Sequence, residues 1–153
     1  MPLDRKYRKT ATGSSVSYGE YFTAAEIFLK ENNHEILREA IFKQTRKNIS
    51  LNQTIAGNIY LEKHGEFYHP SRIEIVFPEE KIQFVLNVAV SETGRNIIDQ
   101  EYSILRRLYL ESQDSYTPAV YGKGSVKTDH GILSMFIGQW FEEFHEFHLS
   151  ETE

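Results

Sequence analysis

Three segments between residues 54 and 90 alternate apolar and polar side chains, and this alternation most constrains what the chain can fold into. They read TIAGNIYLEK, SRIEIVF and KIQFVLNVAV. A period of two places successive side chains on opposite faces of a β-strand, so the segments predict three consecutive strands. The short link from Pro78 to Lys81 predicts that the second and third strands form an antiparallel hairpin.

Other parts of the chain show helical or further strand patterns. Apolar residues recur at helical spacing in TAAEIFLKE, in HEILREAIFKQTRKN and, after the third strand, in NIIDQEYSILRRLYLES. Asn32 and Asn33 separate the first two of these helices. Two more strands fit AVYGKGSVKT and GILSMFIG. The order predicts an α+β fold, in which N-terminal helices precede a five-stranded antiparallel sheet with one packed helix between the third and fourth strands.

Composition divides the chain and limits its partners. Residues 1–20 are polar and predict a flexible leader, residues 21–48 a helical segment, and residues 49–153 one folded lobe. No cysteine is present, which excludes disulfides and thiolate metal sites and favours the cytoplasm. A net charge of −5 argues against a nucleic-acid partner. No apolar run reaches the roughly 18 residues of a membrane span, so no membrane partner is expected.

The order and the motifs of residues 55–150 resemble the small lobe of protein-kinase-like folds, including aminoglycoside-phosphotransferase relatives. The segment FVLN, ending at Asn87, stands where these kinases have V-A-I-K at the end of their third strand. DQEYSILRRL resembles the following helix, with Glu101 as the acid that pairs with the kinase Lys. TPAVYGKG and LSMFIGQWFEE resemble the fourth strand and the fifth strand that leads into the hinge between the lobes.

The resemblance implies a nucleotide-facing lobe whose cofactor is ATP with magnesium. Asn87 would stand in the slot of the Lys that holds the phosphates, Glu101 would be the acid beside it, and Val85, Met135 and the hinge from Phe136 to Gly138 would line an adenine slot. The loop KHGEFYHPSR takes the place of the phosphate-covering loop, with Lys63 and Gly65 as its binding residues. No metal ligands are predicted from the protein itself.

The chain departs from the kinase pattern at two places. Asn87 replaces the Lys and cannot supply a positive charge. It is a structural amide, a sign of a degenerate site, or a position whose role another cation such as Lys63 has taken. The covering loop has one glycine, Gly65, so side chains would have to hold an anion instead; the candidates are Lys63, His64, His69 and Arg72. The alternative is a solvated turn with ordinary surface histidines.

No catalytic residue is predicted, because the H-R-D and D-F-G motifs of the large lobe do not occur in the chain. The favoured hypothesis is therefore a degenerate phosphotransferase lobe that is inactive on its own.

Two other interpretations remain open. One is a non-enzymatic interaction module whose aromatic hinge edge binds the missing large lobe, a partner protein or a second copy of the chain. That edge comprises Trp140, Phe141, Phe144 and Phe147. The other is a stand-alone α+β domain unrelated to kinases, in which Glu101 would lie away from Asn87.

Overall fold

The fold is taken from a computed structural model, which describes residues 3–7, 17–61, 68–112 and 118–140. Its elements in chain order are β1 (Asp4–Tyr7), α1 (Tyr18–Thr45), the 3₁₀ turn η1 (Leu51–Gln53), β2 (Ala56–Leu61), β3 (Tyr68–Val76), β4 (Lys81–Ala89), α2 (Glu92–Ser112), β5 (Val120–Thr128) and β6 (Gly131–Gln139). Neither of the described helices is long and apolar enough to cross a membrane.

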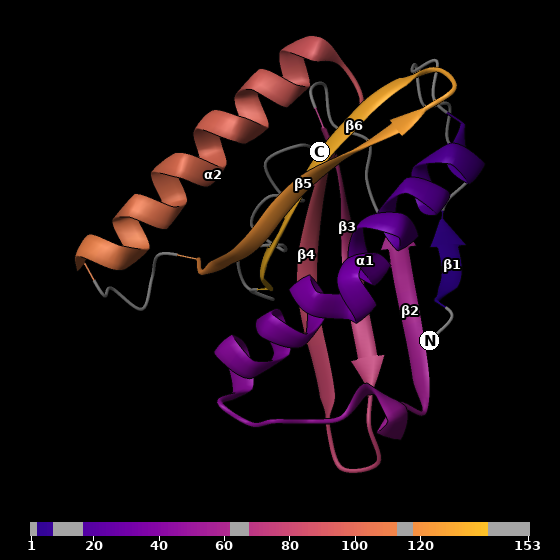
Figure 1. The fold of residues 1–153 in the computed structure, drawn as a ribbon, viewed down its shortest axis with the longest axis vertical. Coiled ribbons are helices and arrows are strands. Elements are labelled where there is room, and N and C mark those ends of the chain that lie inside the picture. The colour runs from indigo at the N-terminus through magenta and orange to yellow at the C-terminus, as the bar shows by residue number, and fades with distance from the viewer. Residues whose placement is uncertain (1–2, 8–16, 62–67, 113–117, 141–153) are drawn as a thin grey trace, which may run out of the picture.

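The strands form one six-stranded mixed sheet in the order β1-β2-β3-β4-β6-β5 (Figure 1). The β3–β4 pair is antiparallel, which confirms the predicted hairpin. The predicted five-stranded antiparallel sheet is wrong, because Asp4–Tyr7 pairs in parallel with Asn58–Leu61 and adds a sixth strand. This strand, DRKY, lies within the predicted leader and shows no alternation of apolar residues. It forms a strand because the free edge of β2 offers unpaired backbone N–H and C=O groups. The local sequence pattern of DRKY does not reveal that such an edge lies nearby.

The two helices pack on opposite faces of the sheet. Along β4, Phe84, Leu86 and Val88 are buried in one core together with α1, whereas Ala89 belongs to a second core formed with α2. Figure 1 shows α1 lying across the strands and the C-terminal end of α2 extending away from them. The large core therefore lies on the α1 face, and the α2 face is only partly covered by its helix.

Helix α1 consists of two helical segments joined by a kink, at the place where the sequence predicts a break between two helices. Ser17 caps its start by accepting a hydrogen bond from the backbone N–H of Glu20. The backbone departs from helical geometry from Glu31 to His34, and Asn32, Asn33 and His34 are all left-handed there. Asn adopts this conformation more readily than most residues, so the asparagines place a kink within α1.

Tyr21 joins α1 to β3 and provides a pH-dependent test of that packing. Its buried hydroxyl lies 2.7 Å from the carbonyl oxygen of His69 and 2.6 Å from Ser71 Oγ. Burial raises the pKa of Tyr21 above its ordinary value, and the Ser71 hydrogen bond offsets this only in part. The phenol thus stays neutral in the folded chain at a pH where it ionises in the unfolded chain.

We expect the free energy of unfolding to fall as pH rises above about 10, the ordinary tyrosine value. Below that pH both states hold the proton, so the contribution of Tyr21 is fully present there. Urea denaturation between about pH 8 and pH 11 measures the slope, which Tyr21→Phe should reduce. The exposed Tyr109 supplies the control Tyr109→Phe. An alkaline slope unchanged by Tyr21→Phe would show that this phenol is not what makes the fold sensitive to base.

Candidate functional site

The candidate site is the face of the sheet on which α2 packs. Because side chains alternate along a strand, Val85 and Asn87 project on the opposite side of β4 from Phe84, Leu86 and Val88. Asn87 is half-buried, and its register neighbours are Pro70 on β3 and Phe136 on β6. The amide therefore sits in an apolar surrounding on the α2 side.

Helix α2 is held on this face by a small aromatic core. Ile98 and Tyr102 pack with Ala89 and Phe136, and the Tyr102 and Phe136 rings are 5.7 Å apart. Glu101 precedes Tyr102, is partly buried, and lies on the same stripe of α2 as Ile98 and Leu105. Asn87 and Glu101 consequently belong to the same side of the sheet.

A buried carboxylate anchors a polar network on the part of this face beyond α2. The residue exposure of Glu74 is only 9%, and Asn58 on β2 donates to its Oε1 at 3.1 Å. Tyr60 Oη and Gln83 Nε2 donate at 3.5 and 3.4 Å, and Lys81 Nζ lies 3.7 Å from Oε2. These donors offset the cost of burying a charged group between β2 and β4.

Next to this network, an arginine is stacked on two aromatic rings. The guanidinium carbon of Arg72 lies 4.3 Å from the ring centre of Tyr60 and 5.6 Å from that of Trp140. Arg72 is the register partner of both Tyr60 on β2 and Val85 on β4. The stacking places a positive charge in the middle of the face.

The structure brings most of the predicted site residues together, but not all of them. Val85 pairs with Gly138 and Asn87 with Phe136, so these four share the α2 face, on which Glu101 also lies. Met135 is fully buried in the core that contains α1, on the other side of the sheet. Lys63 and Gly65 in the covering loop, and Phe141, Phe144 and Phe147 of the predicted hinge edge, lie outside the described residues.

Sequence reasoning missed the polar network and the two rings around Arg72. The signal was present, because Asn58 and Tyr60 alternate with apolar residues on β2, and Arg72 and Glu74 do the same on β3. Polar residues that point to the same side of adjacent strands form one polar face of the sheet. Which residues meet across the strands depends on register, and register is known only from the fold.

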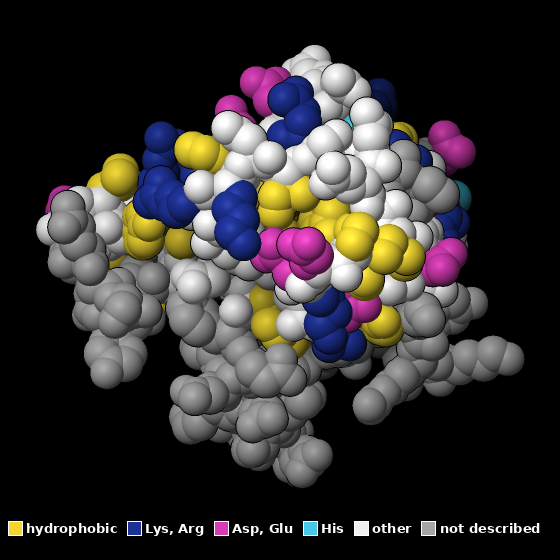
Figure 2. Space-filling view, turned by 90° about the horizontal axis from the view of Figure 1, so that it is seen from below, with side chains coloured by type: hydrophobic (Ala, Val, Ile, Leu, Met, Phe, Trp, Pro, Cys, Tyr) yellow, Lys and Arg dark blue, Asp and Glu magenta, His cyan; other side chains and the backbone are white. Residues whose placement is uncertain are grey.

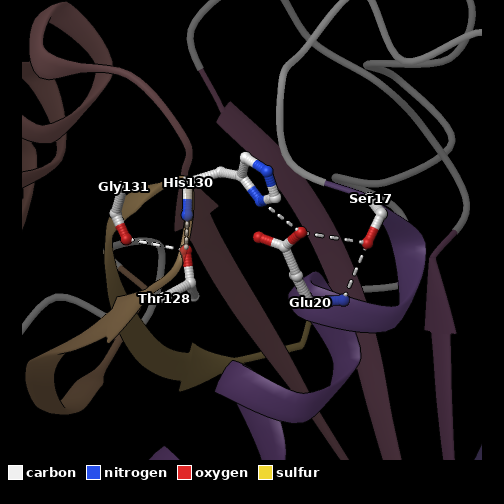
Figure 3. Close-up of polar contacts among 5 residues, drawn as sticks. All are labelled: Ser17, Glu20, Thr128, His130 and Gly131. Carbon is white, nitrogen blue, oxygen red and sulfur yellow. Dashed lines mark hydrogen bonds and ion pairs between the residues drawn. The ribbon is translucent and has the colours of Figure 1, made fainter.

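A second polar cluster, shown in Figure 3, joins α1 to the β5–β6 turn. His130 Nδ1 lies 2.6 Å from Glu20 Oε1, and Ser17 Oγ lies 3.5 Å from the same oxygen. The carboxylate stands between the hydroxyl and the imidazole, so His130 is not placed to take a proton from Ser17. The arrangement is a link between α1 and the sheet rather than a nucleophile with its base.

Elsewhere on the described part of the chain, we find less evidence of a binding site. No group of three His, Asp or Glu side chains suited to a metal occurs among the described residues. An open depression near the C-terminal end of α1 is lined by Arg38, Lys43 and Lys47, with Glu39 among them. Figure 2 shows basic side chains interspersed with acidic and hydrophobic ones on the end of the molecule that it draws. This mixture is typical of a solvated surface.

No family model, no curated protein and no solved structure matches this chain.

Proposed function

We propose that the chain is the nucleotide-facing small lobe of a kinase-like phosphotransferase, degenerate and not catalytic on its own. The observation that carries the proposal is the position of Asn87 and Glu101. Both belong to the face on which α2 packs, and α2 connects β4, which holds Asn87, to the strands that hold Phe136 and Gly138. A stand-alone domain unrelated to kinases was expected to place Glu101 away from Asn87.

The site is degenerate because Asn87 stands where the kinase Lys would be. Asn87 can accept or donate hydrogen bonds but cannot balance phosphate charge. Glu101 keeps the carboxylate that would pair with a Lys at that position. The ligand of the site would be ATP with magnesium, bound weakly.

The test restores the missing charge. We expect magnesium ATP at millimolar concentration to raise the melting temperature of the full chain by several degrees, because a ligand that binds only the folded state stabilises it. Asn87→Lys should tighten ATP binding by about tenfold, since a charged donor replaces a neutral one. Thermal denaturation over a series of ATP concentrations measures both effects.

Asn52→Lys is the matched control, because Asn52 is exposed in η1, outside the strands and α2, and receives the same substitution. It adds the same charge away from the α2 face and should leave ATP affinity within about twofold. The proposal fails if ATP shifts neither the wild-type chain nor Asn87→Lys. It also fails if both Lys variants gain affinity equally, because any added cation would then suffice.

A second candidate function is a non-enzymatic interaction module, favoured by exposed apolar residues on α2. Leu110 is 65% exposed, Ile104 48% and Leu108 41%. Apolar side chains on one exposed helix mark a surface that a partner can cover. A chain that self-associates with rising concentration and shows no response to ATP would favour this function over the nucleotide lobe.

A further inference from the structure

Arg72 is the positive charge nearest to the centre of the α2 face. Its register partner is Val85, two residues from Asn87 on β4. Diagonal neighbours on adjacent strands lie about 7–8 Å apart, within reach of a long side chain. A group bound in front of Val85 would therefore meet Arg72 from β3 and Asn87 from β4.

The rings that stack on Arg72 restrict how it can bind. The guanidinium carbon lies over the rings of Tyr60 and Trp140, at 4.3 and 5.6 Å from their centres. The N–H groups of a guanidinium form a planar fork, and two rings beside it limit how the side chain can turn. A guanidinium held in this way is suited to the bidentate recognition of phosphate oxygens.

The acid closest in sequence on this face has its own donors. Glu74 follows Arg72 by two residues on β3 and accepts hydrogen bonds from Asn58, Tyr60 and Gln83. Lys81 adds a positive charge 3.7 Å from the carboxylate. These groups offset the charge of Glu74 and weaken its repulsion of an anion at Arg72.

We propose that Arg72 is the phosphate-binding cation of this site, in place of the Lys whose position Asn87 occupies. The inference rests on the proposed nucleotide-binding function and names the residue that supplies its missing charge. The recognised group is a phosphate of the nucleotide, held by the fork of the guanidinium from β3 rather than by an ammonium from β4.

The experiment uses thermal denaturation of the full chain with three probes: magnesium ATP, magnesium tripolyphosphate and adenosine. Arg72→Gln should weaken the response to ATP and to tripolyphosphate by about tenfold or more, because a charged hydrogen-bonding group is lost. Its response to adenosine, which carries no phosphate, should match that of the wild-type chain. The phosphate affinity of Arg72→Lys should lie between those of the wild-type chain and Arg72→Gln, since Lys keeps the charge but lacks the planar fork.

Lys123→Gln is the matched control. Lys123 also projects from the α2 face and lies 5.4 Å from the ring centre of Tyr102, but Asp99 is 3.7 Å from its ammonium. Its loss should change ATP affinity by less than about twofold.

Each outcome separates this inference from the function on which it rests. A wild-type chain that responds to none of the probes overturns both. A wild-type response to ATP that Arg72→Gln and Arg72→Lys fully retain overturns only the role of Arg72. A loss of adenosine binding equal to the loss of tripolyphosphate binding would also overturn it, because Arg72 would then stack on the base instead of holding phosphate. If Arg72→Gln does not fold, the comparison of Arg72→Lys with Lys123→Gln decides.

Discussion

Phe28→Ala is expected to lower the free energy of unfolding by about 3–5 kcal/mol, the usual cost of emptying a large core position. Phe28 is 1% exposed in the core between α1 and the sheet. Its ring touches the backbone of β5 so closely that a Cβ on Gly124 would lie 2.9 Å from Phe28 Cε1. The alanine would leave a cavity that neither α1 nor β5 can fill without moving. Because domains of this kind are stable by about 5–15 kcal/mol, the loss would be a large part of the total.

Phe42→Ala is the control for this prediction. Phe42 belongs to the same helix and receives the same substitution, but it is 43% exposed. We expect a change within about 1 kcal/mol, since alanine also favours the helix. Urea denaturation followed by circular dichroism measures both variants. Equal losses for the two would mean that α1 does not pack on the sheet through Phe28.

Gly138→Ala should destabilise the chain by about 1–3 kcal/mol, and Gly138→Val by more, through crowding of the backbone. A Cβ at Gly138 would lie 2.9 Å from the carbonyl oxygen of Ala119. That oxygen already accepts a hydrogen bond from the N–H of Gln139 at 2.8 Å. Relief of the clash therefore requires β5 and β6 to separate where they are bonded. Val85 and Val120, the register neighbours of Gly138, restrict movement in other directions.

Gly19→Ala is the matched control, with the opposite sign expected. Gly19 lies in the first turn of α1, and the nearest contact of an added Cβ would be Ser17 Oγ at 3.8 Å. Alanine favours helix over glycine by up to about 1 kcal/mol, so this variant should be as stable as the wild-type chain or more so. Melting temperatures of the two variants decide the matter: a Gly138→Ala chain as stable as Gly19→Ala would show that β5 and β6 are not packed this closely.

The candidate site could be predicted only in part. The motif FVLN pointed to Asn87 and Val85, and the helical spacing of DQEYSILRRL pointed to Glu101. These residues do lie on one side of the sheet, since each prediction depended on a local period. Met135 was assigned to the same slot but faces α1, because a shift of one residue along a strand moves a side chain to the other face. Tyr60 comes from β2 and Trp140 follows the end of β6, and a linear motif does not connect these two places.

By itself, the sequence determined the character of its local elements. Alternation along KIQFVLNVAV specified a strand with two unlike faces, and Asn32 and Asn33 marked the break in α1, because these preferences involve only neighbouring residues. Only the tertiary structure decided that DRKY would become a strand and that α1 and α2 would cover opposite faces. In both cases the groups that meet are far apart in the chain. An open strand edge and an uncovered apolar face exist only once the rest of the sheet has formed, so local sequence does not reveal them.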